Sequence, residues 1–505
     1  MGKGRFVRVQ KSIITTLCLQ ITTLLCGLIV PRTLLNAFGS EAYGATTSIA
    51  QFLSYITLLE GGIGGVARAA LYKPLAEKDT KRISVIVYEL KHFFRVIAFI
   101  SIGYTFLLAC SFKTISHITC YNWQTSFLLV IAMAVSTFGQ YFIGIAYSAL
   151  IQADQRVYLI NTLSIVTIIL NTIMVIVLVK LGSGLVFVKL VSSCVFLIKP
   201  TAMWIYVNNR YGLNNTVERD QKSLEQRWDG LGQHIAYYIH SNTDVAVLTI
   251  LSNLKTVAVY SVYYMVTNHI RSIVIALCSG MEALFGDMIA KDQKKQLREI
   301  FNIYETIISF ACSIFFSTVY VMIVPFISLY TKGIDDTNYI QPLFAVLITT
   351  ASAIYCLRFP YQSTITAAGH FKQTRVAAYG EAVINIIVSI ILVKKYGLIG
   401  VAIGTIVAIS FRLVYSAVYL SKNIMQRNFV DFSKRFFINV GSIIIIFIIS
   451  HLAISKILID NYIKWIFCAI SVVFISTSMT CLINYIFYKN YTMKILNMIL
   501  IKIRR

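Results

Sequence analysis

The sequence predicts an all-α polytopic membrane protein with about 14 transmembrane helices, arranged as two six-helix bundles and two further C-terminal helices. Three observations carry this prediction: the composition, the number of long apolar runs, and an internal duplication. Of the 505 residues, 57% are hydrophobic and only 13% are charged. A soluble domain carries about 25% charged residues, so most of the surface of this chain must face lipid.

Apolar runs of about 20 residues, long enough to cross a bilayer, occur fourteen times. They lie at residues 13–35, 43–67, 94–112, 127–150, 157–181, 185–206, 232–254, 257–285, 304–330, 343–368, 377–393, 398–420, 436–458 and 462–488. The first run is too long for a removable signal peptide, and it lacks the small-residue cleavage site. The longest polar stretch, Asn208–Gly230, is too short for a catalytic domain.

The Lys and Arg residues predict the orientation. With the N-terminus inside, 29 Lys and Arg residues in and near the loops and chain ends are assigned to the cytoplasmic side, and nine are assigned to the outer side. Because basic residues accumulate on the cytoplasmic side, both termini and Asn208–Gly230 are expected to be cytoplasmic. The net charge of +24 is then explained by basic loops against an anionic lipid leaflet, without a nucleic-acid partner.

The chain repeats itself at an offset of about 215 residues. Asn171 recurs as Asn385, and Lys78-Asp79 recurs as Lys291-Asp292. Spans 1–6 therefore match spans 7–12, and both copies face the same way because six is even. The repeat predicts four parts: residues 1–206 as an N-terminal lobe, 207–231 as a cytoplasmic linker, 232–422 as a C-terminal lobe, and 423–505 as two extra helices with a basic tail. Two such lobes suit a transporter that opens alternately to each side.

Several enzyme classes are excluded by missing motifs. The sequence contains no GxxxxGK[ST] phosphate loop, no HExxH and no GxSxG. The ten cysteines are scattered without a CxxC pair, which argues against a zinc site or a disulfide framework. We therefore expect neither an enzyme nor a cofactor or metal site.

Ionisable residues near the middle of a span are costly, so they mark candidate site residues. Asp244 and Arg271 lie near the middle of spans 7 and 8. They form either a structural ion pair or a polar patch that lines a central cavity. Arg358, two residues before Pro360, either faces the cavity or extends toward the inner headgroups.

A second set of candidates lies in the first copy. Arg32 ends span 1, and Arg68 ends span 2 just after Glu60 and a run of four glycines in five residues. These arginines are either flanking anchors or cavity residues. Acidic residues at membrane depth are few: Glu60, Asp244, Glu282 and Glu381. Asp244 and Glu60 are the candidates for ion coupling, and the excess of basic residues suits an anionic cargo.

Three segments resemble the polysaccharide flippases of the Wzx type, which handle O-antigen, capsule or teichoic precursors. They are GLIVPRTLLNAFGSEAYGATTSIAQFLSYITLLEGGIGGVARAALYKPLAEKD at 27–79, YSALIQADQRVYLIN at 147–161, and NTDVAVLTILSNLKTVAVYSVYYMV at 242–266. The resemblance implies the MATE-like fold of the MOP exporter superfamily, shared with multidrug exporters and the lipid II flippase. It also implies a bacterial cytoplasmic membrane protein.

The same resemblance implies a cargo and partners. The cargo is an undecaprenyl-diphosphate-linked oligosaccharide, moved from the inner to the outer leaflet for cell-surface polysaccharide assembly. Membrane lipids, a polysaccharide polymerase and a chain-length regulator are the implied partners. By correspondence of spans 1, 2 and 8 with the lipid II flippase, Arg32, Arg68 and Arg271 are the implied cargo arginines.

Two other functions stay open at this point. A cation-coupled multidrug exporter of the MATE type needs acids in its cavity, and Asp244 and Glu60 are the available ones. A membrane-embedded polysaccharide polymerase usually needs a substantial outer loop. The longest outer segments, Lys113–Ser126 and Thr331–Pro342, are short.

Overall fold

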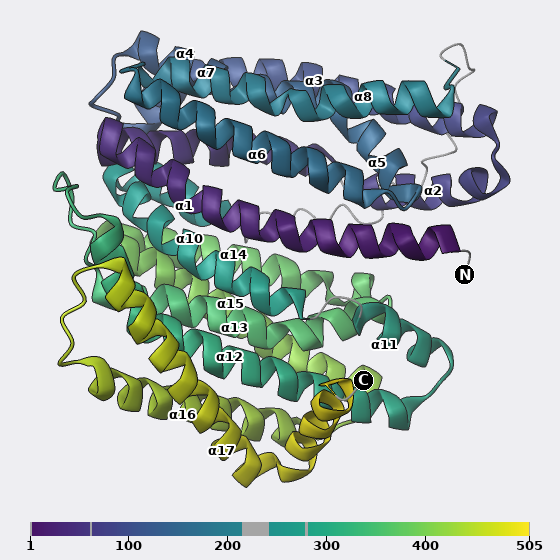
Figure 1. Cartoon of the computed structure of the whole chain (residues 1–505), viewed down its shortest axis with the longest axis vertical. Coiled ribbons are helices and arrows are strands. Elements are labelled where there is room, and N and C mark those ends of the chain that lie inside the picture. The colour runs from purple at the N-terminus through teal and green to yellow at the C-terminus, as the bar shows by residue number, and fades with distance from the viewer. Residues whose placement is uncertain (1–2, 61–62, 215–241, 278–280, 504–505) are drawn as a thin grey trace. The chain divides into compact units, whose positions relative to one another are not determined.

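The computed structural model describes residues 3–60, 63–214, 242–277 and 281–503, and within these ranges it contains helices and no strand (Figure 1). The predicted all-α class is therefore confirmed. The chain forms two compact units, unit 1 at Met1–Ala258 and unit 2 at Val259–Arg505.

Unit 1 is built from long apolar helices with three departures from regular α-geometry. Gly39, with φ 79°, breaks α1 into two helices, and 3-10 and π turns follow in the next spans. The elements are α1 Lys3–Ser54, the 3-10 turn η1 Tyr55–Glu60, α2 Ile63–Glu77, α3 Thr80–Ser116, α4 Trp123–Gly139, the π turn η2 Gln140–Gly144, α5 Ile145–Ala153, α6 Val157–Lys180, α7 Leu185–Phe196 and α8 Ile198–Tyr211. A short apolar helix, Asn242–Leu251, completes unit 1.

Unit 2 contains a second set of helices and the C-terminal pair. Its elements are α10 Leu254–Ala276, which starts in unit 1, then α11 Met281–Ala290, α12 Lys294–Tyr330, α13 Pro342–Ala367, α14 Phe371–Tyr396, α15 Leu398–Leu420, the π turn η4 Ser421–Met425, α16 Phe429–Ile454 and α17 Tyr462–Ile503. The core of this unit packs α12, α13 and α15 around buried side chains such as Phe301, Phe316 and Cys356.

Eleven helices of the described residues are long and apolar enough to cross a membrane, or twelve if the bent pair α10 and α11 is one span. The protein is thus a multi-pass membrane protein, but the predicted count of fourteen is not reproduced. One reason is that α1 runs through the first predicted span and into the second, with only Gly39 between them. Another is that residues 232–241, the first half of the seventh predicted span, lie outside the described residues.

Left-handed turns recur at the spacing of the internal duplication. Five pairs of residues with positive φ are 214 to 216 positions apart: Lys78 and Asp292, His117 and Gly333, Gln155 and Gly369, Gly182 and Gly397, and Gly212 and Gln426. Non-glycine residues rarely adopt this conformation, so chance does not explain the recurrence. The two units therefore repeat the same order of helices and turns.

Equivalent helix pairs also share a hydrogen bond. Ser192 Oγ donates to Asn171 Oδ1 at 2.5 Å between α7 and α6, and Asn385 Nδ2 donates to Thr405 Oγ1 at 3.1 Å between α14 and α15.

The predicted lobe boundaries at 206 and 232 are not tested by this structure. The compact units divide at residue 258, and most of the predicted linker lies outside the described residues. The lobes stay a prediction.

Candidate functional site

The ring of Tyr355 on α13 lies beside two of the predicted site residues. The Cζ atom of Arg271 is 4.6 Å from the ring centroid, and that of Arg358 is 4.7 Å from it. Tyr355 and Arg358 are three residues apart on α13 and so share a face of that helix. Arg271 comes from α10. We call these three residues the arginine–tyrosine cluster; its geometry allows a cation–π contact with each guanidinium.

Arg271 is oriented by its own helix. Its Nη2 atom donates to Asn268 Oδ1 at 2.6 Å and to the Tyr264 hydroxyl at 3.2 Å. These partners lie one and two turns earlier on α10, so the polar face of this helix holds the guanidinium in place. Arg271 is half-buried.

Arg358 has different surroundings. It is 6% exposed and forms an ion pair with Glu381 of α14. Arg412 of α15 lies on the other side of this carboxylate, with Nε 3.8 Å from Glu381 Oε2. Arg412 also donates to the Thr374 carbonyl at 3.0 Å. One buried carboxylate thus joins arginines from two neighbouring helices, which fixes the position of Arg358.

The candidates of the first copy, Glu60, Arg68 and Arg32, lie on three different elements of unit 1. The Tyr141 hydroxyl, in the π turn, donates to Glu60 Oε1 at 2.5 Å, and Glu60 is the last residue of the 3-10 turn. Arg68 Nη1 donates to Gln152 Oε1 at 3.2 Å. Arg32 is half-buried on α1. None of the three cavities described in this structure is lined by Glu60, Arg68 or Arg32.

Asp244 lies half-buried on the helix Asn242–Leu251. Its neighbour Asn242 accepts a hydrogen bond from Gln51 Nε2 at 2.8 Å. Asp244 belongs to unit 1 and Arg271 to unit 2, so the predicted pairing of these two residues stays a prediction.

Two members of the site were not predicted as site residues. In the sequence, Tyr355 looks like any other aromatic residue in an apolar run. Only its spacing of three residues from Arg358 indicates that it belongs to the site. Glu381 was recognised as an acid at membrane depth, but its pairing with Arg358 depends on how α13 and α14 are aligned. Among the described residues there is no group of three or more His, Cys, Asp or Glu side chains that could hold a metal.

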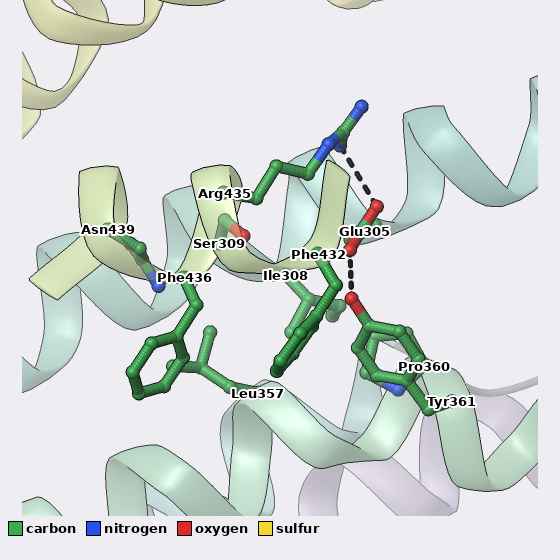
Figure 2. A pocket seen from close by; sticks show the side chains of 10 residues that line it. All are labelled: Glu305, Ile308, Ser309, Leu357, Pro360, Tyr361, Phe432, Arg435, Phe436 and Asn439. Atoms are coloured by element: carbon green, nitrogen blue, oxygen red, sulfur yellow. Dashed lines mark hydrogen bonds and ion pairs between the residues drawn. The ribbon is translucent and has the colours of Figure 1, made fainter. Parts of the chain in front are cut away.

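A second ionic cluster in unit 2 surrounds Glu305 of α12. Figure 2 shows Glu305 between Arg435 and Tyr361. The carboxylate also binds Arg427 Nη1 at 2.9 Å. We call these four residues the Glu305 cluster. It borders a cavity of about 20 Å³, large enough for one water molecule.

An apolar groove of about 440 Å³ lies between α12, α13 and α16. Thr350, Ile354 and Leu357 of α13 and Phe436 and Phe447 of α16 are among its lining residues. Leu357 and Phe436 also line the small cavity beside Glu305. Helix α13 therefore carries Tyr355 and Arg358 of the arginine–tyrosine cluster and one wall of an apolar groove.

Comparison with known proteins identifies the fold. Residues 231–391 match the model of the MatE family. Over 95% of this chain and 99% of the other, the structure is similar to "Lipid II flippase MurJ, inward closed conformation", with a TM-score of 0.67 and 16% identity. A multidrug resistance MATE family transporter of the MOP superfamily aligns with a TM-score of 0.58 and 13% identity, over 81% and 98% of the two chains.

A structure of the Vibrio cholerae MATE transporter VcmN gives a TM-score of 0.57 and 14% identity over 84% of this chain and 99% of its own. No curated protein sequence matches significantly. The chain therefore has the MATE-like fold, and the predicted resemblance to this superfamily is confirmed. The similar structures are those of a flippase and of transporters, in agreement with the prediction of a non-enzymatic protein.

Proposed function

We propose that this chain is a flippase for an undecaprenyl-diphosphate-linked oligosaccharide, moved by alternating access from the inner to the outer leaflet of the bacterial cytoplasmic membrane. The observation that carries the proposal is the arginine–tyrosine cluster at membrane depth. The Arg271 guanidinium beside the Tyr355 ring provides fork-shaped donors whose hydrogen bonds a diphosphate can accept, and Arg358 lies on the same ring. In this scheme Arg271 contacts the diphosphate and Arg358 supports it through Tyr355.

The two faces of α13 also support a lipid-linked cargo. The diphosphate and sugars of such a cargo need polar surroundings, while its polyprenyl chain stays in an apolar environment. The apolar groove offers such surroundings on the same helix. The similarity to a solved lipid II flippase agrees with a lipid-linked cargo but leaves the sugar open.

Further parts of the proposal follow from the sequence. We expect both termini in the cytoplasm, and a polysaccharide polymerase and a chain-length regulator as partners in cell-surface polysaccharide assembly. Arg32 and Arg68 would contact the cargo from the first copy.

A cation-coupled multidrug exporter is the second candidate, because solved MATE transporters share the fold. Such an exporter would use Glu60 or Asp244 to bind a cation or a cationic drug. The hydrogen bond from Tyr141 to Glu60 keeps that carboxylate in a defined place at the end of η1. The arginine–tyrosine cluster favours an anion instead, and for this reason we place the flippase first.

The decisive experiment measures diphosphate binding by the purified protein in lipid nanodiscs. Farnesyl diphosphate serves as a short probe for the prenyl diphosphate part of the cargo. We expect Arg271→Ala to weaken binding about tenfold or more and Arg271→Lys to weaken it less, since lysine keeps the charge without the fork. Arg298→Ala, which removes an exposed arginine of α12, is the control for charge alone.

Binding that is unchanged in Arg271→Ala contradicts the proposed flippase site. The multidrug exporter would be favoured if the protein exports a cationic dye and this export is lost on substitution of Glu60 or Asp244 but not of Arg271. In cells, deletion of the protein should leave lipid-linked oligosaccharide in the inner leaflet, and Arg271→Ala should not restore its transport.

A further inference from the structure

Helix α13 has a weak point in the turn that carries Arg358. Pro360 lies inside the helix and has no backbone N–H, so the carbonyl of Cys356 lacks its usual helical donor. Arg358 lies between these two residues. Side-chain contacts on either side of the turn must therefore help to fix its position.

Those contacts come from two carboxylates on two other helices. On one side Arg358 is paired with Glu381 of α14. On the other side the hydroxyl of Tyr361, the residue after Pro360, donates to Glu305 of α12 (Figure 2). The Tyr361 ring is 3% exposed and packs edge-on against Phe301 and Phe432, with centroids 5.4 and 5.5 Å away.

Glu305 is held in turn by the start of the C-terminal segment. Arg427 Nη1 and Arg435 Nη1 lie 2.9 and 3.2 Å from Glu305 Oε2. Arg435 also donates to Thr306 Oγ1 at 3.0 Å on α12. Burial alone would lower the pKa of Arg427, but its neighbours, first Glu305 and then Tyr361 and Asp431, together raise this pKa above its ordinary range. The cluster closes only when the start of α16 lies on α12.

We infer that Glu305 is a positioning residue for the arginine–tyrosine cluster. Through Tyr361 it fixes the turn of α13 at Pro360, and through Arg427 and Arg435 it makes that turn depend on residues 423–505. The C-terminal helices would then be part of the cargo site's support. The expected effect of Glu305 on cargo binding rests on the proposed function. Its expected effect on the position of the α13 turn does not.

Unit 1 contains a matched cluster that serves as a control. Asp154 binds Arg8 Nη1 at 3.3 Å and Arg156 Nε at 2.5 Å, and it accepts from the Tyr211 hydroxyl at 2.6 Å. The Asp154 cluster thus has the same groups as the Glu305 cluster: one carboxylate, two guanidinium groups and one phenol. The Asp154 cluster involves no residue of α13, so its loss tests the general cost of breaking such a network.

The first test measures backbone hydrogen exchange of α13 in purified protein in nanodiscs, and it needs no ligand. We expect Glu305→Gln and Tyr361→Phe to raise severalfold the exchange rate of the amides at residues 355–362, apart from Pro360, which has none. Asp154→Asn should leave these amides unchanged. Unchanged exchange at 355–362 in Tyr361→Phe, which keeps the ring packing and removes only the hydroxyl, overturns the inference even if Glu305→Gln fails to fold.

The second test uses farnesyl diphosphate binding. Glu305→Gln should weaken binding about fivefold, and Asp154→Asn should not. If Glu305 acts through Arg358, the effects of Glu305→Gln and Arg358→Lys are not additive in the double variant. Additive effects, or equal losses from Glu305→Gln and Asp154→Asn, overturn the inference. Failure of the proposed function is recognised separately, as normal binding by Arg271→Ala.

Discussion

The hydroxyl oxygens of Ser48 and Thr249 lie 2.7 Å apart in a buried hydrogen bond between α1 and the helix Asn242–Leu251. One turn further along α1, Gln51 Nε2 donates to Asn242 Oδ1 at 2.8 Å. The two helices run antiparallel along this seam. Because Ser48 and Thr249 belong to different predicted lobes, the seam must separate if those lobes alternate in their opening.

A disulfide across the seam should therefore stop transport. In the double variant Ser48→Cys with Thr249→Cys, mild oxidation should join the two helices, since the side chains already touch. We expect transport of the lipid-linked cargo to fall to the level of the deletion strain, and reduction with dithiothreitol to restore it. Each single-cysteine variant under the same oxidation is the control. Normal transport by fully cross-linked protein would show that residues 242–258 move with the first lobe.

Close packing at the same seam predicts a position-specific effect of a methyl group. A Cβ atom on Gly44 would lie 1.9 Å from the Leu254 carbonyl oxygen, whereas a Cβ on Gly103 would meet nothing within 4 Å. Gly44→Ala should lower the thermal unfolding temperature by several degrees. Gly103→Ala should leave it unchanged or raise it slightly, since alanine favours a helix by up to about 1 kcal/mol. Equal melting temperatures for both variants would contradict the seam as described.

Removal of the charge on Glu381 should destabilise unit 2. Glu381→Gln leaves the buried guanidinium groups of Arg358 and Arg412 without their shared carboxylate. Loss of one partner in a buried ion pair typically costs about 3–5 kcal/mol. Glu282→Gln, at an exposed acid of α11, is the control. Thermal unfolding in nanodiscs compares the stability of the two variants. A normal melting temperature for Glu381→Gln would mean that water replaces the carboxylate.

Tyr355 should act through its ring rather than its hydroxyl. Cation–π contacts contribute about 0.5–2 kcal/mol each, so Tyr355→Leu should weaken farnesyl diphosphate binding several-fold. Tyr355→Phe keeps the ring and should bind nearly as well as the natural protein. Equal losses in the two variants would assign the effect to the hydroxyl instead.

The architecture of the chain was largely predictable, because composition and repetition act over many residues. The duplication indicated by Asn171 and Asn385 reappears as equivalent hydrogen bonds to Ser192 and Thr405. The exact number of spans was harder to predict. A single glycine with a positive φ, Gly39, separates the first two predicted spans, and apolar content alone does not show where a helix breaks.

The site was predictable only in part. Arg271 and Arg358 stood out because a charge in the middle of an apolar run needs a compensating partner. The partners themselves depend on which helix faces lie together. Glu381 is 23 residues from Arg358, and Glu305 is 122 residues from Arg427. No local pattern encodes such contacts, so they follow only from the folded structure.

A native cysteine offers a test of orientation through its pH dependence. Cys120 lies in the predicted outer segment between α3 and α4, where its backbone N–H and that of Thr119 donate to Glu41 Oε1. Burial and then the negative charge of Glu41 raise the pKa of the Cys120 thiol from 9.0 to about 11. Because a raised pKa keeps the thiol protonated to higher pH, the reactive thiolate is about a hundredfold scarcer at neutral pH.

In a variant that keeps only Cys120, an impermeant maleimide added to intact cells should react slowly at pH 7. The rate should rise about tenfold per pH unit toward pH 9. Glu41→Gln should speed the reaction at pH 7, because it removes the charge that opposes the thiolate. A cysteine at Ser223, in the predicted cytoplasmic stretch outside the described residues, should stay unlabelled in intact cells at every pH. It should react only after permeabilisation. Rapid labelling at Ser223 in intact cells would reverse the predicted orientation of every span.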